Sequence, residues 1–180
     1  RRYDSNEKAA ILYRTNAQSR LFVEHLRRAR IEYNIVGGFS FYERAEIKDV
    51  ISYLKMALNP FDDIALNRVI NTPTRGLGKT SLDELSLKAK DFGTSLWETI
   101  AIITDEKYGQ PLNLTPRAIE AMKRFKIIIE KLSAKVGDSS TGERPVTDVV
   151  VAAIEETGYS AMLRAENSDE AAARLENLEE

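Results

Sequence analysis

The chain contains 180 residues, of which 43% are hydrophobic and 30% are charged, and its net charge is −2. It has no cysteine and a single histidine, which excludes disulfide bonds, thiolate metal sites and clusters of histidine ligands. No segment approaches the roughly 18 consecutive apolar residues that a membrane span requires, and the first residues do not have the pattern of a signal peptide. We therefore expect a cytoplasmic protein of one domain, or one and a half, with no membrane partner.

Charged residues are distributed unevenly along the chain. Residues 1–48 contain ten Lys/Arg and six Asp/Glu, whereas residues 143–180 contain three and ten. The net charge argues against a uniformly basic protein that coats DNA, so any contact with DNA is expected to be local, in the N-terminal part and in selected turns. The chain starts at Arg1 and its last ten residues have a helical pattern, so we also expect a piece of a longer protein.

The N-terminal residues predict a small α/β unit. Residues 9–13 form an apolar run typical of a buried strand, residues 19–30 have a helical pattern, and residues 33–36 form a second strand before a Gly-Gly pair. This order indicates two parallel strands joined by a crossover helix. Three elements cannot close a core, so the unit is expected to be part of a larger α/β domain.

From residue 46 onward the apolar residues follow a helical period. Ser81 and Ser95 each begin a Ser-x-x-Glu pattern that is typical of a capping box, and Thr115-Pro116 is typical of a helix start. The predicted helices cover residues 46–58, 62–70, segments beginning at Ser81 and at Ser95, 115–136, 146–157 and 168–180, with a linker at 137–145. The predicted fold class is therefore mainly α: a β-α-β portion of an incomplete α/β domain, followed by an all-helical domain.

Polar and basic residues follow the first predicted strand. Arg14, Asn16 and Arg20 lie where this strand ends and the next helix begins. In open α/β sheets ligands bind at this edge, where helix amides and cations meet phosphates. The alternative is a charged loop in which Asn16 or Ser19 only caps the helix.

A second segment, residues 37–49, begins with a Gly-Gly pair and contains Phe39, Phe41 and Tyr42. The glycines permit a sharp backbone turn. Aromatic side chains beside such a turn are more often packing residues than binding residues, and the pattern alone favours packing here.

A third segment places Gly76 and Gly78 in a turn between two predicted helices, which suits a helix-hairpin-helix arrangement. Glycines let backbone N–H groups approach a phosphate, and the start of the next helix adds partial positive charge. Residues 67–90 contain five Lys/Arg and two acidic residues, which also favours an anion. Such contacts hold a duplex without reading its sequence. The alternative is a plain turn in which Ser81 acts only as a cap.

The tripeptide Gly78-Lys79-Thr80 looks like the end of a Walker A loop. The first glycine of that motif would stand at position 73, which is Pro73, and the segment before it is predicted to be a helix rather than a strand. We therefore expect no ATP-binding loop. His25 has no acid or nucleophile at a diagnostic spacing, so we predict no catalytic residue and no metal ligand.

The strings Ala10–Arg20 and Asn71–Ser81 together, in this order, resemble motifs of the UvrD/PcrA/Rep group of superfamily 1 DNA helicases. The resemblance implies that residues 1–47 are part of the RecA-like domain 2A, with motif IV. It implies that residues 48–180 are most of the helical domain 2B, with motifs IVa and IVb, truncated at its C-terminus. Members of this family couple the hydrolysis of ATP, with Mg²⁺, to 3′-to-5′ movement along single-stranded DNA in repair and replication. Their ATPase motifs lie outside these residues, so the chain alone is expected to hydrolyse no ATP.

The resemblance also assigns roles to individual residues. Motif IV implies that Arg14 and Asn16 contact the single-strand backbone, and that Arg20 either does likewise or pairs with a nearby carboxylate. Motif IVa places a duplex-contacting lysine at Lys48, with Arg44 a weaker candidate. Motif IVb implies a grip on duplex phosphates by six residues, Arg75, Gly76, Gly78, Lys79, Thr80 and Ser81.

The expected partners are a single-strand/duplex DNA junction bound without sequence preference, the rest of the helicase chain, and repair or replication proteins. Two other functions stay open at this point. One is a regulatory or protein-interaction domain of the helicase, and the other is a stand-alone module that binds duplex DNA.

Overall fold

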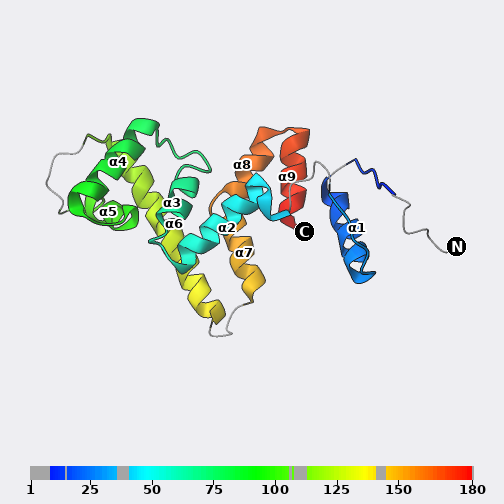
Figure 1. The fold of residues 1–180 in the computed structure, drawn as a ribbon. Helices are drawn as coiled ribbons and strands as arrows, with labels where there is room; N and C mark the ends of the chain where they lie inside the picture. Colours follow the sequence, from blue (N-terminus) through cyan, green and yellow to red (C-terminus); the bar gives the residue numbers. More distant parts are fainter. Residues whose placement is uncertain are drawn as a thin grey trace. The chain divides into compact units, whose positions relative to one another are not determined.

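The computed structural model describes residues 9–14, 16–35, 41–105, 107, 113–140 and 145–179. The chain divides into two compact units, Arg1–Ser40 and Phe41–Glu180 (Figure 1). No helix in the described ranges is long and apolar enough to cross a membrane.

The N-terminal unit contains one described helix, α1 (Asn16–Arg28), which covers most of the predicted helix 19–30. Residues 9–14 and 31–35 are described but form no strand. The predicted β-α-β arrangement is therefore not present in the described residues. A strand needs a neighbour for its backbone hydrogen bonds, and Leu12 is 94% exposed, so apolar side chains here have no core to enter.

All the regular secondary structure in the described residues of the second unit is helical, as the periodicity predicts. It consists of η1 (Phe41–Glu43), α2 (Ala45–Leu58), α3 (Asp63–Val69), α4 (Lys79–Phe92), α5 (Leu96–Ile103), α6 (Pro116–Ser140), α7 (Val146–Glu155), α8 (Tyr159–Glu166) and α9 (Asp169–Glu179). Figure 1 shows α4 and α5 at one end of this unit and α8 and α9 at the other. Helix α8 was not predicted, because only eight residues separate Gly158 from Asn167.

Helix α2 is the centre of the second unit and packs against α3, α6, α7 and α9. The side chains of Tyr53 and Met56 on α2 and of Met122 and Phe125 on α6 are completely buried in one continuous core. Trp97 packs against the edge of this core, as expected for a structural residue. Burial of this apolar surface is the main stabilising contribution to the fold.

The two predicted capping boxes have different outcomes. At Ser95 the box is confirmed: the amide of Glu98 donates to Ser95 Oγ at 3.2 Å, and the Ser95 amide donates to Glu98 Oε2 at 3.1 Å. The prediction of a capping box at Ser81 is wrong, because α4 begins at Lys79 with Gly78 as its N-cap. Thr115 caps α6 as predicted, since its Oγ1 accepts from the Ala118 amide at 3.2 Å.

The C-terminal end of α6 differs from the prediction. The helix runs to Ser140 rather than ending near residue 136, so it includes the first part of the predicted linker. Residues 141–144 of that linker lie outside the described residues, as does the Gly-Gly pair at 37–38.

Candidate nucleic-acid interface

The turn between α3 and α4, residues 70–78, is closed by the side chain of Asn71. Its Nδ2 donates to the Leu77 carbonyl at 2.8 Å, and its Oδ1 accepts from the amides of Arg75 at 2.8 Å and Leu77 at 3.3 Å. Leu77 is 2% exposed and anchors the turn in the core. The turn is therefore fixed from inside while its outer edge is left to solvent.

Gly76 and Gly78 lie on this outer edge and are both exposed, but they are glycines for different reasons. Gly76 has φ +80°, a conformation that residues with a Cβ rarely adopt. Gly78 has φ −76°, and a Cβ placed on it would have no atom within 4 Å. The open space beside Gly78 permits a ligand to approach the backbone closely.

Helix α4 begins at this edge without a side-chain cap or an acidic residue in its first turn. The Ser81 amide donates to the Gly78 carbonyl at 3.0 Å. Among the described residues, no hydrogen-bond acceptor faces the amides of Lys79 and Thr80. These two exposed N–H groups and the positive end of the helix dipole are suited to an anion such as a phosphate.

The guanidinium group of Arg75 points away from this edge, into the protein. Its Nη2 donates to the Tyr53 hydroxyl at 2.7 Å and to the Thr157 carbonyl at 3.2 Å. Its Cζ lies 5.4 Å from the centre of the Phe125 ring. Nη1 donates to three carbonyl oxygens of the preceding turn, those of Val69, Ile70 and Pro73, at 3.0, 3.3 and 3.0 Å. Arg75 thus joins the turn to α2, α6 and the end of α7.

Tyr53 completes this support from α2. Its hydroxyl donates to the Thr72 carbonyl at 2.5 Å while it accepts from Arg75. Burial raises the pKa of Tyr53 above its ordinary value, and the nearby Arg75 opposes the increase. The hydroxyl therefore stays protonated and can donate to the turn at physiological pH.

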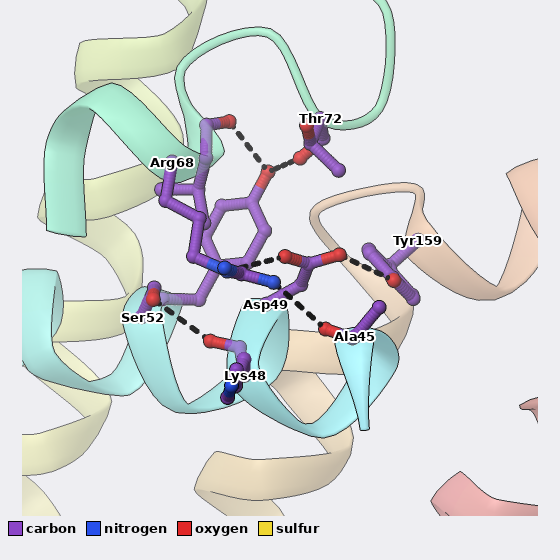
Figure 2. A network of polar contacts seen from close by, with 9 residues as sticks. Ala45, Lys48, Asp49, Ser52, Arg68, Thr72 and Tyr159 are labelled. Carbon is purple, nitrogen blue, oxygen red and sulfur yellow. Dashed lines mark hydrogen bonds and ion pairs between the residues drawn. The ribbon is translucent and has the colours of Figure 1, made fainter. Parts of the chain in front are cut away.

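A second polar group, centred on Asp49, holds α2 to its neighbours (Figure 2). Figure 2 shows Asp49 between Arg68 and Tyr159, with Arg68 Nε at 2.7 Å from Oδ1 and the Tyr159 hydroxyl at 2.7 Å from Oδ2. Burial and then the hydrogen bond to Asp49 raise the pKa of Tyr159. Together these contacts link α2, α3 and α8, which fixes the framework behind the turn.

Lys48 and Arg44, the two cations of the segment 37–49, occupy different environments. Lys48 is exposed on α2 and, within the described part of the chain, forms no ion pair. Arg44 is only 9% exposed, and its Nη1 donates to Asn177 Oδ1 on α9. Asn177 in turn donates to Glu46 at 2.7 Å. Lys48 is therefore accessible to a ligand, whereas Arg44 takes part in a buried contact between helices.

The three candidates for single-strand contact lie in the N-terminal unit. Arg14 is exposed, and its amide donates to Gln18 Oε1 at 3.1 Å. Asn16 and Arg20 belong to α1, but their side chains lie outside the described residues, and so does Thr15. These candidates belong to the N-terminal unit, whereas the turn belongs to the helical unit.

Arg117 is a neighbour of the turn that no sequence pattern indicates. A Cβ built on Gly76 would lie 3.5 Å from Arg117 Nε and 3.7 Å from Nη2. Arg117 is exposed in the first turn of α6. Arg117 and Gly76 are far apart in the sequence, and only the packing of α6 brings them together. No sequence pattern could therefore indicate that they are neighbours.

The segment around Gly78-Lys79-Thr80 does not have the architecture of an ATP-binding loop. The segment before Gly78-Lys79-Thr80 is helix α3 and a turn, not the strand that precedes a phosphate-binding loop. Across the described ranges there is no group of three or more His, Asp or Glu side chains that could hold a metal ion.

Known proteins are similar to nearly all of this chain. The ATP-dependent DNA helicase PcrA of Bacillus subtilis (strain 168) is 40% identical over 171 residues, which is 95% of this chain and 22% of PcrA. DNA helicase II of Escherichia coli (strain K12) is 40% identical over 173 residues, 96% of this chain and 23% of that protein. PcrA of Staphylococcus aureus (strain Mu50 / ATCC 700699) is 34% identical over 171 residues, 95% of this chain and 22% of that protein.

The chain thus spans less than a quarter of the length of these relatives. The family of UvrD-like helicase C-terminal domains matches residues 1–180, which is the whole chain. The chain belongs to the UvrD-like helicase C-terminal domain family.

Proposed function

We propose that this chain is the DNA-binding portion of an ATP-dependent 3′-to-5′ DNA helicase and that the turn before α4 grips the backbone of duplex DNA. The observation that carries the proposal is the exposed start of α4, where the amides of Lys79 and Thr80 lack acceptors among the described residues beside the open space at Gly78. Phosphate contacts of this kind hold a duplex without sequence preference. Ser81 contributes its hydroxyl, since its amide is already used within the helix.

Arg75 has a different part in this proposal from the one that the sequence suggested. Its two terminal nitrogens donate to oxygens of the protein interior. We assign it the task of holding the turn in shape from behind, so that Gly76, Gly78 and the start of α4 face outward. Lys48, exposed on α2, is proposed as a separate duplex contact.

Residues 1–47, which include the whole N-terminal unit, are proposed to belong to domain 2A, and residues 48–180 to domain 2B. The proposed β-α-β arrangement would form when the other strands of the parent's sheet supply hydrogen-bond partners. Arg14, Asn16 and Arg20 would then lie at the sheet edge and contact single-stranded DNA. ATP and Mg²⁺ would bind to other parts of the parent.

A contact with another part of the helicase chain, or with a repair or replication protein, is a second candidate function. It is favoured by Leu58, Phe61 and Ile64, which are exposed apolar side chains near the α2–α3 connection. Closely spaced exposed apolar residues often mark a protein contact. This function is compatible with the duplex grip, because the three residues lie outside the turn.

The duplex grip can be tested by fluorescence anisotropy of the 180-residue chain with a labelled duplex that carries a 3′ single-stranded tail. Gly78→Ala is the informative variant, because its φ suits alanine and the new methyl group meets no protein atom. The methyl group would occupy the space where the phosphate is proposed to bind, and we expect affinity to fall at least about fivefold.

Gly137→Ala is the matched control, since its Cβ also meets no atom and it lies about 30 Å along α6 from Arg117. Its affinity should equal that of the parent sequence. Binding should also weaken steeply as salt increases, because phosphate contacts release counterions. Equal binding by the two alanine variants would contradict the proposed site. Gly76→Ala is less useful because its positive φ would strain the turn itself.

A further inference from the structure

Arg117 is placed beside the turn by a helix that belongs to the core. Its neighbour Ala118 is 2% exposed and packs in the core with Ala121 and Met122. The Arg117 side chain lies over Gly76, with Nε, Nη2 and Cζ at 3.5, 3.7 and 3.9 Å from the Cβ position of that glycine. A larger residue at position 76 would therefore crowd this arginine as well as strain the backbone.

The guanidinium group of Arg117 has no acidic neighbour among the residues that the structure describes. Within the described residues, no carboxylate lies at ion-pair distance from it, and no hydrogen bond joins it to another side chain. The first turn of α6 contains no acidic residue, and the same is true of α4. A cation near a helix N-terminus is unfavourable for the fold, so this arginine does not stabilise the helix that carries it.

Arg124, on the same helix, provides a contrast. Its Nε lies 3.8 Å from Glu120 Oε1, one helical turn earlier, and its side chain is well exposed. This is an ordinary surface ion pair. The two arginines share a helix and exposure to solvent, but only Arg117 is both unpaired in the described structure and next to the glycine turn.

We propose that Arg117 is a further phosphate-binding residue of the duplex grip, supplied by α6 to the backbone that the start of α4 holds. This inference rests on the proposed function. Arginine presents several N–H donors in a planar fork that matches phosphate oxygens. The turn offers backbone amides and Arg117 offers a side-chain fork, so together they surround one stretch of backbone from two elements.

The test uses the anisotropy assay described above with Arg117→Ala, Arg117→Lys and the control Arg124→Ala. We expect Arg117→Ala to bind about tenfold more weakly at low salt. The slope of log affinity against log salt should decrease in magnitude by about 0.9, the value for one lost phosphate contact. Arg117→Lys should keep the slope and bind with intermediate affinity, because it retains the charge without the fork. Arg124→Ala should bind like the parent sequence.

Thermal unfolding separates a lost contact from a damaged fold. Arg117→Ala should melt at the same temperature as the parent sequence or higher, since an unfavourable cation at a helix start is removed. If Arg117→Ala binds the duplex normally while Gly78→Ala binds it weakly, the role proposed for Arg117 is wrong, but the proposed duplex grip is still supported. If Arg124→Ala loses as much affinity as Arg117→Ala, the effect is general charge and the inference fails. If the parent sequence does not bind the duplex, the proposed function fails and this inference fails with it.

Discussion

The two units of this chain differ in how much of their structure their own residues determine. In the helical unit, apolar residues of α2 and α6 bury one another, and Tyr53 and Phe125 are completely covered. In the N-terminal unit, α1 is formed, but Leu12 and other apolar residues of the predicted strands are exposed. Helices satisfy their backbone hydrogen bonds internally, whereas strands depend on neighbours. The comparison shows that the same apolar content produces a core only where its packing partners are present.

The largest expected effect comes from removing a core side chain of the helical unit. Phe125→Ala deletes a fully buried ring that also faces the Arg75 guanidinium. It should lower the free energy of unfolding by about 3–5 kcal/mol, measured by urea denaturation. Leu12→Ser is the matched change in the other unit and should alter stability by less than about 0.5 kcal/mol, because the side chain is already exposed. Similar losses from both variants would remove the distinction between the units.

An intermediate effect is expected at high pH from Tyr159, which is buried in the helical unit. The pKa of Tyr159 is raised in the folded protein, so above the ordinary value of 10.0 the unfolded chain loses this proton first. The associated stability is complete below pH 10 and is lost as the pH rises. Above pH 10 the free energy of unfolding should therefore fall more steeply for the parent sequence than for Tyr159→Phe, by up to about 1.4 kcal/mol per pH unit. Parallel curves from urea denaturation at each pH would show that Tyr159 is not protected by the fold.

The smallest effect compares two serines that have the same local sequence pattern. Ser95→Ala removes a capping box whose two reciprocal hydrogen bonds are present, and should cost about 1 kcal/mol. Ser81→Ala should cost less than about 0.5 kcal/mol, because α4 starts before it and Gly78 is the N-cap. Thermal melting of both variants checks this. A larger loss for Ser81→Ala would mean that this serine caps the helix after all.

The sequence predicted most of the helical unit because most of its helices have a local signal. Ser95 and Thr115 cap helices at the positions that their patterns indicate. The start of α4 was misplaced because a glycine turn, which has no side-chain signal, begins the helix earlier than the Ser-x-x-Glu pattern suggests. Short helix α8 was missed because its eight residues span little more than two helical turns, which is too short to define a period.

The candidate site was predictable only in part, because some of its contacts join residues that are distant in the sequence. The exposed glycines and the start of α4 form one continuous segment, so their pattern is visible in the sequence. The inward direction of Arg75 depends on acceptors at Tyr53 and Thr157, which are distant in the sequence. The place of Arg117 beside Gly76 likewise depends on how α6 packs. A basic residue can be counted from the sequence, but whether it supports the site or faces a ligand is decided by the fold.

The central claim is that duplex phosphates bind at the start of α4. Its most direct test is a titration of the isotope-labelled chain with a short duplex, followed by NMR of the backbone amides. We predict that the largest shifts are those of Gly78, Lys79 and Thr80, the segment where amides without acceptors in the described structure face solvent. Largest shifts at Leu58–Ile64, with the start of α4 unchanged, would contradict the account and place the DNA contact elsewhere.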